Sequence, residues 1–241
     1  MMIKTLIASL MLCVGTAYAS AEIQIHQQPV LQLSHINDLA HLVTQPALQQ
    51  NWWPGTVIAD PARRLVAQQQ YQQTLEQIQH WQRNSSADYA ETAQALLRQL
   101  GQIRVTGRLF TSLDPDIVRL YAAANRTLAG KYDLYPAHRP DTILLLGAVD
   151  GAGAIPWQPG YSVRQYLAHH AALAGADKSY ATVIAPDGSA EQVPIAYWNQ
   201  RHVEVMPGSI LWLGIDPWHL SGEDRSLNQH IVSLLTKRIP D

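Results

Sequence analysis

The sequence predicts an α+β protein with two small mixed-sheet domains, a helical hairpin inserted in the first, and an amphipathic helix after the second. Short apolar runs are typical of buried strands, two longer stretches have helical periodicity, and turn-forming residues separate them. We expect the domains at residues 22–138 and 141–216, the inserted hairpin at residues 61–101, and the terminal helix at residues 221–238. Residues 136–140 are interpreted as the linker.

The first 21 residues have the features of an export signal. Lys4 supplies a positive charge, and Leu6–Val14 is an apolar core too short to span a bilayer. Small residues then predict cleavage after Ala19 or Ala21, which indicates a soluble periplasmic protein. The single cysteine, Cys13, lies inside this segment, so the processed chain is expected to have no disulfide.

The composition excludes some classes of function. Of the 241 residues, 47% are hydrophobic and 15% are charged, which is typical of a globular chain. The net charge is −2 and no cluster of lysine and arginine occurs, so binding of nucleic acid through bulk charge is not expected.

The first domain is expected to begin with two short strands between Glu22 and Leu33, separated at Pro29. A short helix capped by Ser34 or Asn37 follows, and then a strand at Thr56–Ala59. After the hairpin, a strand at 103–110, a helix at 116–124 and a closing strand near 128–135 complete the domain.

Two stripes of apolar residues at helical spacing predict the hairpin between Pro61 and Gly101. The first stripe consists of Leu65, Tyr71, Leu75, Ile78 and Trp81, and the second of Tyr89, Ala93, Leu96, Leu97 and Leu100. The glutamines between the apolar positions indicate a solvated face rather than an interaction tract. Because a hairpin is an addition to a small sheet domain, a docking role for it stays open.

The second domain is expected to contain a strand at Thr142–Val149 and a helix that begins at the cap Ser162, has apolar positions as far as Ala171 and is stopped by Gly175. Asp187-Gly188 predicts a β-hairpin, and Pro207-Gly208 a turn between two further strands. Ser221-Gly222-Glu223-Asp224 resembles a capping box at the start of the terminal helix. We expect this helix to pack on the second domain; contact with a membrane surface is the less favoured alternative.

Several of these turns, taken in order, resemble a known domain. The stretches are Pro159-Gly160-Tyr161-Ser162-Val163, Ala174-Gly175-Ala176, Asp187-Gly188 and Met206-Pro207-Gly208-Ser209. They are similar to the soluble-ligand-binding β-grasp domain of polysaccharide export proteins. With Val105-Thr106-Gly107-Arg108, the organisation of nearly all of the processed chain resembles the capsule and exopolysaccharide biosynthesis GfcC family. The resemblance implies a periplasmic protein with two β-grasp domains and a role in making or exporting a surface polysaccharide.

No motif for catalysis, metal binding or cofactor binding is evident in the sequence. His169 and His170 are adjacent, a spacing that points their rings apart on a helix, and neither a nucleophile elbow nor a dinucleotide-binding loop occurs. Asp114 and Asp116 are interpreted as turn and cap residues. We therefore expect no metal, no cofactor and no enzyme activity, although carboxylates that meet only in space stay an open alternative.

Two features indicate binding. The chain has seven tryptophans and ten tyrosines but one phenylalanine, a use of aromatic residues with a polar atom that suits partly hydrated surfaces and sugar stacking. The candidate ligand-binding aromatics are Trp52, Trp53, Trp157, Tyr161 and Trp198. Arg108 is the sixth candidate, since an inward arginine needs partners such as a bound carboxylate or a sugar hydroxyl. The alternatives are that the aromatic residues fill two small cores and that Arg108 forms an internal salt bridge or faces solvent.

The sequence therefore predicts a non-enzymatic periplasmic accessory protein that binds a surface polysaccharide or a polysaccharide-export protein. Two alternatives stay open: a periplasmic enzyme that modifies the polysaccharide, and a scaffold that binds protein partners through the helical hairpin.

Overall fold

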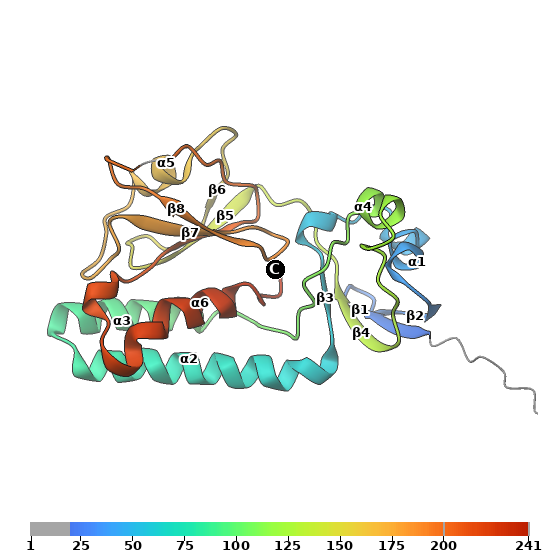
Figure 1. Ribbon diagram of the computed structural model, residues 1–241, viewed down its shortest axis with the longest axis horizontal. Coiled ribbons are helices and arrows are strands. Elements are labelled where there is room, and N and C mark those ends of the chain that lie inside the picture. Colours follow the sequence, from blue (N-terminus) through green and yellow to red (C-terminus); the bar gives the residue numbers. More distant parts are fainter. Residues whose placement is uncertain (1–19, 200, 241) are drawn as a thin grey trace, which may run out of the picture.

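The structure is a computed structural model that describes residues 20–199 and 201–240. Two mixed β-sheets lie at different ends of an elongated molecule, and a long helical hairpin runs beneath the second sheet (Figure 1). The α+β class, the inserted hairpin and the terminal helix are confirmed. Nearly all of the predicted export signal lies outside the described residues.

The first sheet has four strands in the order β2-β1-β4-β3. Their bounds are Ala21–Ile25 for β1, Leu31–Ile36 for β2, Val57–Ala59 for β3 and Gly130–Tyr135 for β4. β1 is antiparallel to β2 and parallel to β4. In β1 every second residue is buried, as expected for a strand with one face on the core. The segment after the hairpin continues the sheet through an amide of Leu109 that donates to Ile58 O at 2.9 Å.

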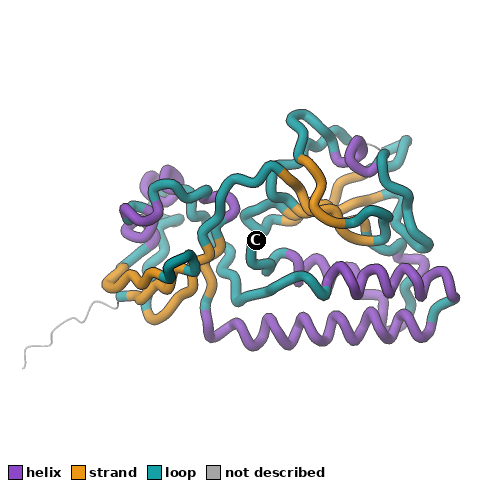
Figure 2. The backbone as a smooth tube through the Cα atoms, turned by 180° about the vertical axis from the view of Figure 1, so that it is seen from behind, coloured by secondary structure: helices purple, strands orange, loops and turns teal. Residues whose placement is uncertain are grey.

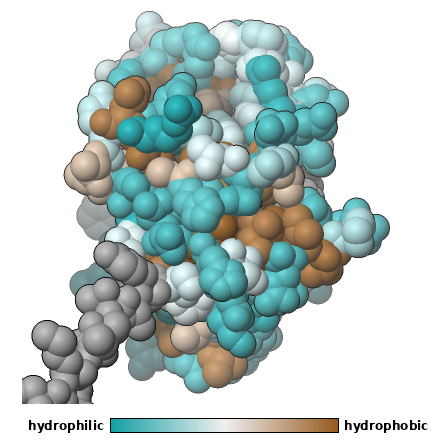
Figure 3. All heavy atoms as spheres, turned by 90° about the vertical axis from the view of Figure 1, so that its right-hand side faces the viewer, coloured by the Kyte–Doolittle hydropathy of each residue, from teal (hydrophilic) through white to brown (hydrophobic). Residues whose placement is uncertain are grey.

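Short helices cover this sheet. They are α1 (Leu39–Val43), α4 (Pro115–Leu120) and the 3₁₀ turns at Pro46–Leu48, Trp53–Gly55 and Pro61–Arg63. α1 is capped by Asp38, whose carboxylate accepts from His41 N at 2.8 Å, so the expected caps Ser34 and Asn37 are wrong. Ser34 lies inside β2, because pairing with β1 extends that strand beyond the expected end. Seen from this end of the molecule, the surface has small hydrophobic clusters separated by hydrophilic residues (Figure 3).

The second sheet has five strands in the order β6-β5-β9-β7-β8. Their bounds are Thr142–Gly147 for β5, Gly153–Pro156 for β6, Tyr180–Ile184 for β7, Ala190–Pro194 for β8 and Ile210–Leu213 for β9. The central pair β5 and β9 is parallel, and the other neighbours are antiparallel. The helix α5 (Val163–Leu167) lies between β6 and β7 in sequence and begins at a capping box formed by Ser162 and Gln165.

Three local expectations are corrected. α5 ends at Leu167 instead of reaching Ala171, because the amide of Ala171 donates to the carboxylate of Asp150 at 2.6 Å and the chain turns away from the helix axis. Residues 103–110 and 203–205 are extended, but they form isolated bridges rather than strands. Ser221 makes no side-chain cap; a 3₁₀ turn at Gly222–Ser226 precedes α6 (Leu227–Leu235), and another lies at Pro217–His219.

The hairpin belongs to the first domain in sequence but to the second in packing. α2 (Arg64–Asn84) and α3 (Ala87–Leu100) lie with α6 beneath the second sheet, seen from behind in Figure 2. Most of their apolar stripe is part of the second core: Ile78, Trp81, Ala93, Leu96 and Leu100 are all at most 3% exposed. Leu65, expected in the same stripe, is 69% exposed. Side-chain bonds add to this contact, since the amide of Gln99 donates to Gly147 O at 3.0 Å and accepts from Gly147 N at 2.8 Å. The apolar side of the hairpin is therefore buried, and the docking role that the sequence left open falls to its glutamine-rich side.

α6 is buried in the same way. Its apolar residues Leu227, Ile231, Leu234 and Leu235 lie in the second core between the sheet and α2. Within residues 20–199 and 201–240, no helix combines the length and the apolar character needed to cross a membrane.

Candidate functional site

Arg108 joins the two domains. It lies in the extended segment that follows the hairpin, where the backbone of Arg108 bridges to Ala59 of β3. Its side chain is only 9% exposed and crosses to the second domain, where Nη2 donates to Pro186 O at 2.7 Å and Nη1 donates to Thr236 O at 3.3 Å. The alternatives left open by the sequence are an internal salt bridge and exposure to solvent; Arg108 instead binds these two carbonyl groups, which come from the β7–β8 turn and the end of α6.

Burial changes the electrostatics of this guanidinium. Loss of hydration lowers the pKa of Arg108 to about 10, and the nearby carboxylate of Asp187 acts in the opposite direction. The side chain therefore remains charged at neutral pH, and bound carbonyl dipoles stabilise it. Its guanidinium carbon also lies 5.9 Å from the centre of the Phe110 ring, a cation–π contact.

Trp52 is a second interdomain contact. Its amide donates to Ala137 O at 2.8 Å, and its ring lies against two glycines. A Cβ on Gly55 would lie 2.4 Å from the ring, and a Cβ on Gly208 would lie 3.2 Å from it. Trp52 thus packs the 3₁₀ turn of the first domain against the Pro207-Gly208 turn of the second.

A groove opens between the domains beside Arg108, and we call it the interdomain groove. It has a volume of about 600 Å³, within the range of small-ligand sites. The first domain contributes Trp53, Phe110 and Asp114, and the second contributes Asp187, Ser189 and Met206. Aromatic surface, hydroxyls, carboxylates and the buried guanidinium therefore meet in one place. A smaller cavity of about 150 Å³ is lined by Trp52 and His138 and also by Arg108.

The other three sequence candidates lie elsewhere, on the second domain. Trp157 donates from Nε1 to Val205 O at 2.7 Å and has the guanidinium of Arg139 5.6 Å from its ring centre. Tyr161 packs edge-on against Tyr166 at 5.5 Å. Trp198 is 78% exposed. None of these three lines the interdomain groove.

Phe110 is an aromatic groove residue that was not among the candidates from the sequence. It is the only phenylalanine of the chain, it is 58% exposed, and it stands two positions after Arg108 in an extended segment. Side chains at i and i+2 of an extended chain point to the same side, so the spacing alone indicates that Phe110 and Arg108 lie beside each other.

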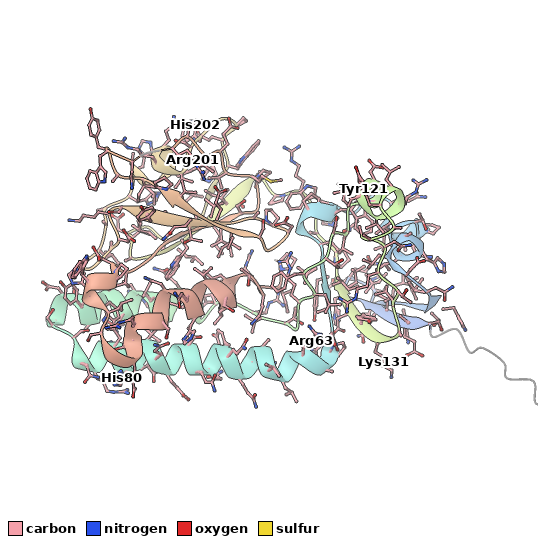
Figure 4. The ribbon with its side chains drawn as sticks, in the orientation of Figure 1. Arg63, His80, Tyr121, Lys131, Arg201 and His202 are labelled. Carbon is pink, nitrogen blue, oxygen red and sulfur yellow. The ribbon has the colours of Figure 1, made fainter. Side chains whose placement is uncertain are left out.

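A cluster of polar side chains around the buried carboxylate of Asp133 holds the base of the hairpin to the first sheet. Asp133 of β4 is 4% exposed, accepts from His26 Nε2 at 2.7 Å and pairs with the guanidinium of Arg64 at the start of α2. The neighbouring Arg63 and the distant His80 mark the two ends of α2 in Figure 4. The cluster explains how one helix is fixed to the first domain while it packs under the second.

No three histidine, cysteine, aspartate or glutamate side chains in the described part of the chain are grouped so as to hold a metal ion. The carboxylates of the groove also have structural partners. Oδ1 of Asp114 caps α4 by accepting from Asp116 N at 2.8 Å, and Oδ1 of Asp187 accepts from Ser189 N at 2.8 Å.

Comparison with known proteins gives two findings. The model of the capsule biosynthesis GfcC N-terminal domain matches residues 19–139, and that of the capsule biosynthesis GfcC C-terminal domain matches residues 151–240. The uncharacterized protein YjbG of Escherichia coli (strain K12) is 38% identical over 244 residues, covering 99% of this chain and 100% of the relative. The chain therefore belongs to the capsule biosynthesis GfcC family.

Proposed function

We propose that this protein is a periplasmic, non-enzymatic accessory protein of capsule or exopolysaccharide production, and that it binds a segment of the glycan in the interdomain groove. Membership of the capsule biosynthesis family supports the association with polysaccharide. The observation that carries the site is the meeting of Trp53, Phe110 and hydrogen-bonding side chains across the groove. Aromatic faces beside hydroxyl and carboxylate groups suit a sugar, which has apolar faces and a polar rim.

The topology of the second sheet supports the same reading. Its first and last strands, β5 and β9, form a central parallel pair, and one helix follows the first strand hairpin. We interpret this arrangement as a β-grasp, the type of domain that the turn pattern resembles. The first sheet has the corresponding order with the Leu109 segment alongside β3.

The first strand, β1, helps to decide between the two predicted cleavage sites of the export signal. Ala21 is fully buried and pairs with Ile36 and Gly130 in the first sheet. Cleavage after Ala21 would remove this residue from β1, whereas cleavage after Ala19 keeps the strand whole. We therefore favour Ala19, and N-terminal sequencing of the protein recovered from the periplasm tests it.

The binding proposal is tested by titrating the processed protein with the surface polysaccharide of its host while tryptophan fluorescence is recorded. A saturable change is expected, and Phe110→Ala should weaken binding about fivefold, because an aromatic contact contributes about 1 kcal/mol. Leu120→Ala is the matched control, since Leu120 is 76% exposed in the same domain and does not line the groove. Equal affinities of the two variants would exclude this groove.

The same titration distinguishes a protein that only binds the glycan from an enzyme that modifies it. The glycan is sized before and after incubation, and an unchanged chain length is expected. A shortened or lengthened glycan would support an enzyme, with Asp114 and Asp187 as the carboxylates to substitute, because both line the groove.

A protein partner is the second candidate, and the exposed pair Tyr197 and Trp198 favours it. These side chains are 81% and 78% exposed and neighbour each other in one loop of the second domain. Binding of the purified periplasmic domain of the host's polysaccharide-export protein should weaken in Trp198→Ala but not in Trp218→Ala, which removes another exposed tryptophan. Equal loss in both variants would reject this loop as the contact.

A further inference from the structure

Trp212 of β9 has a buried polar atom without a partner. Its side chain is 1% exposed, and among the described residues its indole Nε1–H has no hydrogen-bond acceptor. Buried indole N–H groups usually donate a hydrogen bond, because an unpaired polar group loses its hydration without compensation. The indole therefore marks a place where an acceptor from outside the chain is favoured.

The same tryptophan lines a pocket of about 420 Å³, which we call the indole pocket. It is formed by one face of the second sheet and by α6, which lies beneath β7 in Figure 1. Strand register sets its wall: Trp212 of β9 pairs with Thr182 of β7, which in turn pairs with Gln192 of β8. These three side chains thus form a row from the buried indole to the exposed edge strand.

Gly214 keeps the pocket open beside the indole. A Cβ at this position would lie 3.3 Å from Trp212 Nε1 and 2.9 Å from Asn228 Oδ1. Asn228 is itself fixed, because its amide accepts from Ile215 N at 2.9 Å and donates to Ile215 O at 2.5 Å. Its oxygen accepts from the backbone of Ile215, and the indole N–H makes no hydrogen bond to it.

The remaining lining indicates the class of ligand. The groups are the hydroxyls of Tyr180, Thr182 and Ser233, the amides of Gln192 and Gln229, and one carboxylate, Asp177. The carboxylate accepts from the backbone of Ser179 at 2.8 Å, and no lysine or arginine lines the pocket. Uncharged donors and acceptors with an aromatic edge match a neutral ligand that carries hydroxyl groups.

We propose that the indole pocket binds one neutral saccharide unit, with a sugar hydroxyl accepting the hydrogen bond from Trp212 Nε1. The choice of a sugar rests on the proposed glycan function, but the pocket is separate from the interdomain groove and shares none of its lining residues. The protein would then hold a glycan at two places, one between the domains and one beneath the second sheet.

The test is a titration of ¹⁵N-labelled protein with D-glucose, D-galactose and L-fucose in turn, followed through the indole Nε1–H signals. The chain has seven tryptophans, and the signal of Trp212 is the one absent from the spectrum of Trp212→Phe. With at least one sugar, a saturable shift of this signal is expected, while the signal of Trp218, which is 93% exposed, stays in place. The absence of a shift at Trp212 with all three sugars overturns the proposal.

Affinity measurements on variants complete the test. Trp212→Phe keeps an aromatic ring but removes the N–H group, so sugar binding should weaken about tenfold. Gln192→Ala, on the exposed edge strand, is the second variant if Trp212→Phe does not fold, and it should also weaken binding. Unchanged affinity in the variant that folds overturns the proposal.

The groove variant separates this inference from the proposed function. In Phe110→Ala, the monosaccharide should still shift the Trp212 signal although polysaccharide binding is reduced. If wild-type protein does not bind the polysaccharide but the Trp212 shift persists, the proposed function fails and the pocket stands. If polysaccharide binds at the groove without any Trp212 shift, the pocket fails alone.

Discussion

At the scale of single residues, Gly188 shows how one position can satisfy two demands. It lies in the β7–β8 turn with φ of +88°, a conformation that side chains other than glycine rarely adopt. It also faces Arg108, because a Cβ at this position would lie 2.9 Å from the guanidinium carbon and 3.0 Å from the Phe110 ring. Gly188 is therefore required both by the conformation of the turn and by the contact of Arg108 between the domains.

We predict that Gly188→Ala destabilises the protein more than Gly130→Ala. Gly130 has φ of +90° and no atom within 4 Å of a built Cβ, so its substitution should cost only the backbone strain, about 1 kcal/mol. At Gly188 the methyl group must also displace a guanidinium held by two carbonyls, which adds about 1–3 kcal/mol. Urea denaturation of both variants measures the difference, and equal midpoints would mean that Arg108 moves aside freely.

Tyr71 gives a prediction on pH. Its hydroxyl donates to Leu100 O at 3.1 Å and joins α2 to α3, and burial raises the pKa of Tyr71 above its ordinary value of 10.0. The folded protein then keeps the phenol proton at a pH where the unfolded chain has released it, so the free energy of unfolding falls as the pH rises above about 10.

Tyr71→Phe should make this alkaline loss of stability shallower. Urea midpoints measured at about pH 8 and about pH 11 give the slope, and the phenol is protonated in both states at the lower value. An identical slope in wild type and variant would show that Tyr71 does not contribute.

At the scale of elements, the hairpin α2–α3 is the piece whose role the tertiary structure changes. Its amphipathic pattern predicts two helices, and both form. Their apolar side is covered by the second sheet and α6. A scaffold role through that side is therefore excluded, and an exposed role is left only to the glutamine-rich face.

We expect Leu96→Ala to destabilise the protein by about 3 kcal/mol, because Leu96 is fully buried in the second core. Leu65→Ala is the matched control: the residue lies in the same hairpin and is 69% exposed, so its cost should stay within about 0.5 kcal/mol. Calorimetric unfolding compares the two. Similar melting temperatures would mean that the hairpin is not part of the folded core.

At the scale of the whole molecule, the two domains are joined by packing and hydrogen bonds as well as by the linker. The first domain contributes the hairpin to the second core, and its Arg108 reaches across the interface to the β7–β8 turn and the end of α6. The predicted boundary near residues 136–140 separates the two sheets, but it does not separate the two cores.

We predict that residues 141–240 do not fold alone, because this fragment lacks the hairpin side chains that fill its core, such as Trp81 and Leu96. A ¹H–¹⁵N correlation spectrum of the fragment should show poor dispersion, and addition of a peptide of residues 61–101 should restore it. A well-dispersed spectrum of the fragment without the peptide would contradict the shared core.

The sequence by itself determined much of the local structure. The cap at Ser162, the turn at Asp187-Gly188 and the two helices of the hairpin depend on neighbouring residues, so their signals can be read along the chain. Arg108 and Trp53 were also singled out by residue type, and both line the interdomain groove.

Only the tertiary structure decided which surfaces are buried and which side chains meet. Arg108 finds carbonyl partners 78 and 128 residues away, the hairpin packs under a sheet that follows it in sequence, and Trp212 is left without an acceptor beside Gly214. Apolar periodicity shows that one face of a helix or strand is buried, but it does not show which element covers that face. The reason is that the hydrophobic effect has no directional preference for one apolar partner over another. The partners of buried polar groups follow from that packing, and so does the site.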